Sequence, residues 1–136
     1  MGRKRYNVST IEQFVGREMR VSDWLTVDQQ RINEFADCTS DHQWIHIDIE
    51  RAKRESPPGS TIAHGYLTLS LLATMQMGLN LVPEGVSHVL NYGLDRVRFI
   101  ASVKSGARIR QARIVSGKIK CVRTPPLERQ CSTSRA

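Results

Sequence analysis

The stretch AHGYLTLSLLATMQMGLNL, residues 63–81, decides the fold. Apolar residues stand on nearly every side of the helix that it predicts, which is typical of a helix surrounded by protein. Polar residues interrupt the stretch at Thr68, Ser70, Thr74 and Gln76, so we do not expect it to span a membrane. A helix of this kind needs a layer of other elements around it.

Strand-like segments stand on both sides of this helix in the sequence. Residues 18–25 alternate loosely, residues 88–103 carry β-branched and aromatic side chains, and residues 107–115 alternate apolar with cationic ones. One buried helix with strands around it is an α+β arrangement.

Two capping patterns predict further helices. Ser9 with Glu12 precedes a short helix at residues 10–15, and Thr26 with Gln29 starts a second helix. The predicted inner face of the second helix is Ile32, Phe35 and Ala36. Residues 39–48 and 56–61 are expected to be loops, and residues 50–56 a charged helical turn.

The length of 136 residues, with 40% hydrophobic and 24% charged residues, suits one soluble globular domain. The net charge of +7 is uneven, because residues 104–136 hold 9 basic residues against Glu128 alone. Three cysteines without a paired spacing predict neither a disulfide framework nor a zinc site. Because no apolar signal region follows the basic N-terminus, we expect a cytoplasmic protein.

An acid and an imidazole stand five positions apart at Asp41 and His46. Across one irregular turn, the two side chains can converge on a single small molecule such as water, and histidine exchanges protons near neutral pH. The alternative is that Asp41 caps a turn and His46 is a hydrogen-bonded core histidine.

Metal binding is a second interpretation of this segment. The spacing of His42 and His46, with Asp41 and Asp48 nearby, suits zinc or iron in a helix. The pattern offers no third well-placed ligand, so no metal is predicted.

Gly65 stands at the start of the predicted buried helix. A helix N-terminus presents unpaired N–H groups, and a glycine there lets a ligand oxygen approach closely. Close packing of the helix is the simpler reason for a glycine at this position.

Three blocks carry a family resemblance: FADCTSDHQWIHID (35–48), STIAHGYLTLSLL (60–72) and NYGLDRVRF (91–99). In order and spacing they resemble the MaoC-like dehydratases, a hotdog-fold group that includes the (R)-specific enoyl-CoA hydratases. The resemblance covers roughly residues 10–110. The sequences of the three blocks are especially similar to those of the nodulation protein N subgroup.

The resemblance implies an antiparallel sheet wrapped around one long helix, and a dimer. It implies that Asp41 and His46 hold a catalytic water and that the Gly65 N–H donates to a thioester oxygen. The implied reaction is hydration of a trans-2-enoyl-CoA, or dehydration of a 3-hydroxyacyl thioester, in making the acyl chain of a nodulation signal. No cofactor is implied. Further candidate substrate-contacting residues are His64, Ser70 and Asn91.

Three departures accompany the resemblance. Ala73 stands where the family has a serine eight places after the glycine, and Ser40 stands where it has a glycine before the catalytic aspartate. If that loop needs a positive φ, Ser40 strains it. ARIV (112–115) and KIKCV (118–122) can form strands, but the family's closing strand is not recognisable, so the C-terminal strands look shortened or altered.

These patterns divide the chain into a flexible basic N-terminus at 1–8, a single hotdog domain at 9–122 and a disordered basic tail at 123–136. Two other functions stay open. One is a non-catalytic protein that binds acyl thioesters or a partner. The other is a nucleic-acid-binding module that depends on residues 104–136, which we do not expect because the body carries no matching basic face.

Overall fold

The computed structural model describes residues 6–86, 88–91, 93–114, 119–124 and 128–133. The backbone forms two compact units. The first unit consists of Met1–Val21, Leu79–Val97 and Ala112–Ala136, and the second of Ser22–Gly78 and Arg98–Gln111.

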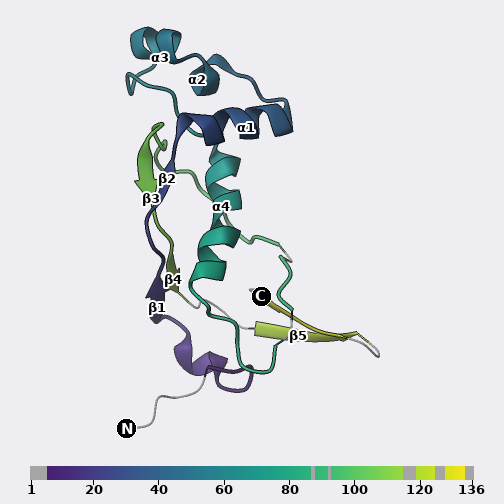
Figure 1. Cartoon of the computed structure of the whole chain (residues 1–136). Coiled ribbons are helices and arrows are strands. Elements are labelled where there is room, and N and C mark those ends of the chain that lie inside the picture. Colours follow the sequence, from purple (N-terminus) through teal and green to yellow (C-terminus); the bar gives the residue numbers. More distant parts are fainter. Residues whose placement is uncertain (1–5, 87, 92, 115–118, 125–127, 134–136) are drawn as a thin grey trace. The chain divides into compact units, whose positions relative to one another are not determined.

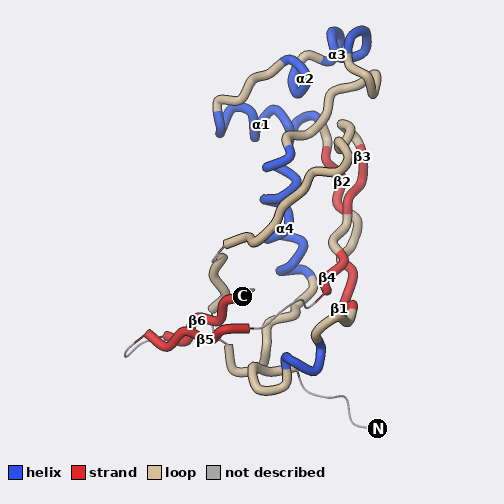
Figure 2. The backbone as a smooth tube through the Cα atoms, turned by 180° about the vertical axis from the view of Figure 1, so that it is seen from behind, coloured by secondary structure: helices blue, strands red, loops and turns tan. Residues whose placement is uncertain are grey.

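The second unit combines four helices with one pair of strands among its described residues. Its elements are β2 (Leu25–Val27), α1 (Gln29–Thr39), α2 (Trp44–Ile47), α3 (Ile49–Glu55), α4 (Gly65–Gly78) and β3 (Ala107–Ile109). β2 pairs with β3 in antiparallel fashion, with Leu25 opposite Ile109. In both backbone views α4 runs beside these strands, and α1 lies across the start of α4 with α2 and α3 beyond it (Figures 1 and 2). The α+β class predicted from the sequence is confirmed.

The core of this unit lies between α4, α1 and the strand pair. Its buried members are Val27, Ile32, Ala63, Leu67, Leu71 and Met75. Leu67, Leu71 and Met75 stand four residues apart, so they form one face of α4. Tyr66 and Met77 on the same helix are exposed. The helix is thus confirmed, but the predicted burial on all sides is wrong, because the short strand pair covers one face only.

No helix in the part of the chain that the structure describes is long and apolar enough to cross a membrane.

The start of α1 differs from the sequence prediction. Thr26 lies within β2, and the Asp28 side chain caps the helix by accepting from the Arg31 N–H at 2.9 Å. Gln29 is therefore free for another contact. The predicted inner face is confirmed, since Ile32 and Ala36 are buried.

The predicted loop at 39–48 contains one helical turn, α2. A single turn is shorter than the window in which apolar periodicity can be recognised, so the sequence could not indicate it. The charged turn predicted at 50–56 is confirmed as α3, which Asp48 caps through the Arg51 N–H.

The first unit begins with η1 (Ile11–Phe14), a 3₁₀ helix within the segment predicted to be helical. The Asn7 side chain, rather than the predicted Ser9–Glu12 box, accepts the Ser9 and Thr10 N–H groups, each at 3.0 Å. β1 (Glu18–Val21) pairs antiparallel with β4 (Ala112–Ile114). The strand predicted at 18–25 is thus two strands, β1 and β2.

β5 (Ile119–Thr124) and β6 (Glu128–Thr133) form an antiparallel hairpin. β4 and β5 confirm the predicted ARIV and KIKCV strands. Residues 128–133, part of the tail predicted to be disordered, form β6 and pair with β5 through strand hydrogen bonds that composition does not indicate.

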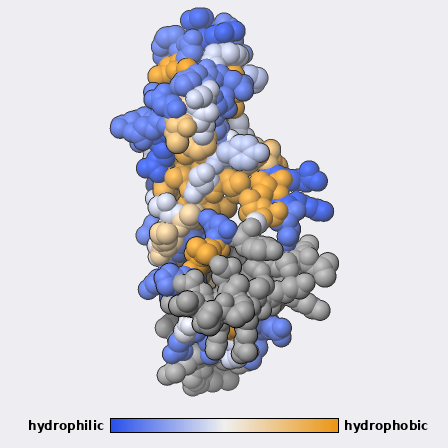
Figure 3. Space-filling model, turned by 90° about the vertical axis from the view of Figure 1, so that its right-hand side faces the viewer, coloured by the Kyte–Doolittle hydropathy of each residue, from blue (hydrophilic) through white to orange (hydrophobic). Residues whose placement is uncertain are grey.

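The strand predicted at 88–103 does not form among the described residues of that segment. A strand needs a second backbone to pair with, whereas alternation of side chains alone does not provide one. Six of its large apolar side chains are exposed: Val89, Leu90, Leu94, Val97, Phe99 and Ile100. Figure 3 shows hydrophobic side chains gathered on one face.

Candidate active site

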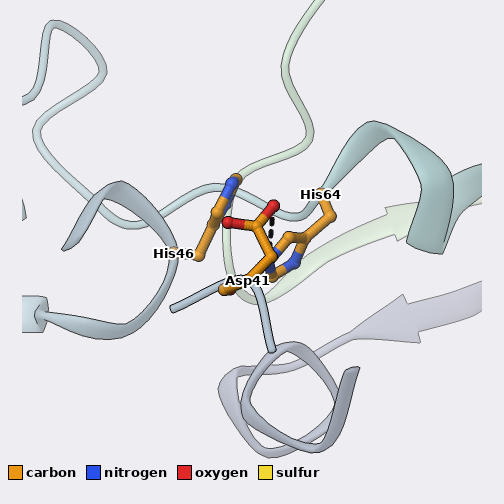
Figure 4. Close-up of side chains that lie close together, drawn as sticks. All are labelled: Asp41, His46 and His64. Atoms are coloured by element: carbon orange, nitrogen blue, oxygen red, sulfur yellow. Dashed lines mark hydrogen bonds and ion pairs between the residues drawn. The ribbon is translucent and has the colours of Figure 1, made fainter. Parts of the chain in front are cut away.

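Asp41, His46 and His64 meet within the second unit (Figure 4). One metal-ligating side-chain atom from each lies within 4.8 Å of the others. Asp41 follows the end of α1, His46 belongs to α2, and His64 immediately precedes α4. Two of the three are the residues that the sequence predicts for proton transfer.

The backbone conformation of Ser40 directs Asp41 toward the site. Ser40 ends α1 with φ 58° and ψ 22°, which is the left-handed region, and the Asp41 N–H donates to the Ala36 carbonyl at 3.1 Å. The positive φ considered for this loop is therefore present. The Asp41 side chain is 42% exposed, and its carboxylate accepts no hydrogen bond from the described residues, so it can receive one from substrate or water.

His46 is held in one orientation by a backbone carbonyl. Its Nδ1 lies 2.7 Å from the Ile62 carbonyl oxygen, and because a carbonyl can only accept, Nδ1 carries the hydrogen. The Ile62 N–H donates to the Ile45 carbonyl at 3.0 Å, which joins the same two segments. The imidazole is buried, with Nε2 left to exchange a proton.

Gln29 connects α1 to both segments of the site. Its Nε2 donates to the His46 carbonyl at 2.7 Å, and its Oε1 accepts from the buried Thr61 hydroxyl at 2.5 Å. The spacing of Thr26 and Gln29 predicts only a capping role for Gln29. A local spacing rule cannot indicate contacts to residues 17 and 32 positions away.

His64 contacts both of the other members. Its ring stacks on that of His46, with centroids 3.7 Å apart, and its Nε2 donates to the Asp41 backbone carbonyl at 3.0 Å. The side chain is only 4% exposed, and its Nδ1 has no hydrogen-bond partner among the described residues. The substrate contact predicted for His64 from the sequence stays a prediction, and His64 is not among the residues that line the pocket described below.

A pocket of about 280 Å³ opens beside this cluster. Both His46 and Gly65 line it, together with Thr68, Phe99 and Val103. Gly65 is the first residue of α4, where the helix leaves backbone N–H groups unpaired. The pocket therefore brings a proton-exchanging imidazole and a potential oxyanion donor to one cavity.

The cluster does not fit a metal ion as it stands. Imidazole lone pairs lie in the ring planes, and metal ligation needs them to converge on one point. The rings of His46 and His64 are stacked with only 26° between their planes, so their lone pairs lie in nearly parallel planes and do not converge on one point. His42, the other ligand considered from the sequence, pairs with Asp37 on the surface at 2.8 Å.

Two other sequence candidates are not among the residues that line the pocket. Ser70 is exposed, and its hydroxyl donates to the Tyr66 carbonyl one turn earlier at 2.8 Å. Asn91 is an exposed residue of the first unit. Ala73 is exposed on α4.

The chain is similar to a known domain family and to several curated proteins. A family model described as MaoC like domain matches residues 10–132. The chain is 50% identical over 111 residues to nodulation protein N of Rhizobium leguminosarum bv. viciae, covering 81% of this chain and 68% of that protein. It is 47% identical over 104 residues to 3-hydroxyacyl-thioester dehydratase Z of Mycobacterium tuberculosis, covering 76% and 68%. The chain thus spans about two thirds of the length of these curated relatives.

A solved structure, described as a monoamine oxidase regulatory protein from Archaeoglobus fulgius, has a TM-score of 0.70 and 29% identity to this chain. The match covers 90% of this chain and 78% of that one. This likeness and the family match confirm the predicted hotdog fold.

Proposed function

The chain belongs to the MaoC-like domain family and is an enzyme of the dehydratase/hydratase class, and from that premise we propose the reaction and the groups that perform it. The reaction is hydration of a trans-2-enoyl thioester, or the reverse dehydration of a 3-hydroxyacyl thioester. The observation that carries this proposal is a pocket lined by both His46 and Gly65, with Asp41 beside His46.

Hydration makes three demands on a site. A base removes a proton from water as its oxygen bonds to C3, an acid delivers a proton to C2, and a donor stabilises the negative charge that develops on the thioester oxygen. The bonds formed are C3–O and C2–H, and the C2–C3 double bond becomes single. No redox step is needed.

Asp41 and His46 meet the first two demands. The Nδ1–H of His46 donates to the Ile62 carbonyl, which leaves Nε2 as the atom that exchanges a proton. The half-exposed carboxylate of Asp41 can hold the same water. Because the two groups share one water, we assign proton transfer to the pair rather than to either residue alone.

Gly65 meets the third demand. As the first residue of α4 it presents its N–H at the positive end of the helix dipole, and it lines the pocket that His46 also lines. The thioester oxygen would therefore accept from Gly65 while C2 and C3 face the Asp41–His46 pair.

The test is turnover of trans-2-butenoyl-CoA, followed as loss of the enoyl-thioester absorbance. We expect Asp41→Asn and His46→Gln each to lower the rate by about 10²- to 10⁴-fold. The matched controls are Asp37→Asn and His42→Gln, which alter the surface Asp37–His42 pair and should leave the rate unchanged. Losses below tenfold for both site variants would reject the assignment.

We propose that the substrate is carried as an acyl-CoA or acyl-carrier thioester and that no metal takes part. Prolonged treatment with a chelator should then leave the rate unchanged. A lost rate that zinc restores would contradict this part. From the likeness to nodulation protein N we also propose that the product enters the acyl chain of a nodulation signal.

A homodimer is the assembly we propose. The exposed Phe99 and Ile100 of the second unit support it, because large apolar side chains at a surface are often covered by a partner. Light scattering of the purified protein should give twice the 15.4 kDa chain mass.

A further inference from the structure

The ring of Phe99 lies directly against the backbone of Gly65. A Cβ placed on Gly65 would be 2.9 Å from each of two Phe99 ring carbons, Cδ2 and Cε2. Carbon atoms that are not bonded prefer separations of about 3.5–4.0 Å, so only a glycine permits this approach. Phe99 thus covers the residue whose N–H we propose as the thioester donor.

Phe99 is packed but also open to solvent. Its ring meets that of Tyr66 edge to face, with centroids 5.9 Å apart and 78° between the planes. The residue is nevertheless 52% exposed. A side chain with this environment can be truncated without leaving a sealed cavity in the core.

Phe99 is also the largest side chain that lines the pocket. At about 280 Å³, the pocket stands just below the range of about 300–1,000 Å³ found for small-molecule sites. Its apolar lining includes Ile62, Ala63 and Val103, which suits a hydrocarbon chain, whereas His46 and Thr68 are polar. Space next to the proposed reacting atoms is therefore limited, and the Phe99 ring occupies part of it.

We infer that Phe99 is a specificity-determining residue that restricts this site to short acyl chains. The inference rests on the proposed function, because it takes the pocket to hold the acyl group next to the Asp41–His46 pair. A longer enoyl chain would have to displace the ring from Gly65, whereas a short chain fits beneath it.

The experiment compares kcat/KM for trans-2-butenoyl-CoA and trans-2-octenoyl-CoA. In Phe99→Ala, the ratio of the octenoyl to the butenoyl value should rise at least about tenfold, since a single methylene in an apolar pocket already changes kcat/KM by about 10- to 200-fold. Phe99→Leu should give a smaller rise. Met77→Ala is the matched control, because Met77 is a large exposed apolar residue of α4 outside the pocket lining. The octenoyl-to-butenoyl ratio of kcat/KM in Met77→Ala should equal that of the parent protein.

A second measurement does not depend on turnover. Calorimetry with the saturated thioesters butanoyl-CoA and octanoyl-CoA gives the binding preference of each variant, and light scattering checks that the oligomeric state is unchanged. If the parent binds but does not turn over and the preference shifts in Phe99→Ala, the reaction is wrong and the pocket assignment stands.

Another outcome is that turnover is present while neither the octenoyl-to-butenoyl ratio of kcat/KM nor the binding preference shifts in a folded Phe99→Ala or Phe99→Leu protein. In that case the reaction stands and the role of Phe99 is overturned. Absence of both turnover and binding would overturn both proposals. Should Phe99→Ala fail to fold, Phe99→Leu and Phe99→Met provide the same comparison with smaller loss of packing.

Discussion

The imidazole ring of His64 stacks on that of His46, with centroids 3.7 Å apart and planes inclined by 26°. His64 also donates from Nε2 to the backbone carbonyl of Asp41 at 3.0 Å. One buried side chain therefore contacts both residues proposed for proton transfer. It constrains the His46 ring through packing and the Asp41 loop through a hydrogen bond, so we propose that it is a positioning residue.

Replacing His64 should lower kcat more than it alters KM. His64→Phe keeps a planar ring against His46 but loses the bond to the Asp41 carbonyl, and His64→Gln loses the ring but offers an amide donor. Because a shift of about 1 Å in a catalytic group can reduce the rate about 10²-fold, we expect a loss of that order in kcat for the more disruptive of the two variants. Steady-state kinetics on trans-2-butenoyl-CoA gives the result.

The control for this substitution is His42→Phe, which changes an exposed histidine that bonds only to Asp37 among the described residues. Thermal unfolding of each variant separates loss of fold from loss of position. A raised KM with unchanged kcat would instead mean that His64 contacts substrate, the role first inferred from the sequence.

Gln29 should prove important for both stability and activity. Its amide bonds to the His46 carbonyl and to the Thr61 hydroxyl, and Thr61 is buried. Gln29→Ala leaves that hydroxyl without this partner, so the free energy of unfolding should fall by about 1–3 kcal/mol. Activity should fall as well, because α2 loses its hydrogen bond from the Gln29 side chain of α1.

Urea unfolding with enzyme assays measures both effects. Gln30→Ala provides the comparison, because Gln30 bonds only to the exposed Glu34 one turn away at 2.9 Å among the described residues. That contact should contribute less than about 0.5 kcal/mol. Equal losses of unfolding free energy and of activity in the two variants would contradict this prediction. The hydrogen bonds of Gln29 to His46 and Thr61 would then contribute no more than an exposed contact.

Local patterns predicted the parts of this protein that depend on neighbours in the chain. The apolar run indicated α4, and the blocks around Asp41, His46 and Gly65 indicated residues that the structure brings together within one unit. Spacing could not indicate the contacts of Gln29, because they join residues from distant segments. The segment 88–103 shows the same limit for strands: its side chains alternate, but a strand forms only where another backbone is available to pair.

Ser40→Gly should stabilise the protein without changing its chemistry. Ser40 adopts φ 58° at the end of α1, a conformation that disfavours residues with a Cβ by about 1–2 kcal/mol and that glycine adopts freely. Part of the gain is lost because glycine gives the unfolded chain more freedom, so we expect a net increase in unfolding free energy of up to about 1 kcal/mol.

Denaturant unfolding at constant m-value tests this expectation. Thr39→Gly is the matched control, since Thr39 is the last helical residue of α1 and glycine there should destabilise by about 0.5–1 kcal/mol. A destabilised Ser40→Gly would mean that the serine side chain contributes something that the strain argument omits.

Gly65→Ala should disturb the site through Phe99. The new methyl group would meet the Phe99 ring at 2.9 Å, and overpacking of this kind costs about 1–3 kcal/mol. The substitution keeps the Gly65 N–H, so a loss of activity has two explanations: the methyl group displaces the Phe99 ring, or it blocks the approach of substrate to the Gly65 backbone. Gly78→Ala, at the other end of the same helix, brings the added carbon within 4 Å of nothing beyond its chain neighbours and the adjoining helix backbone, so it should be near neutral.

A double-mutant cycle separates the two explanations for such a loss. If the clash with Phe99 is the cause, Phe99→Ala removes it, and Gly65→Ala should cost less stability and less activity in that background than in the parent. The unfolding midpoints and kcat/KM values of the four proteins give the coupling. Strictly additive effects would mean that Gly65 is needed for its backbone approach to substrate rather than for its contact with Phe99.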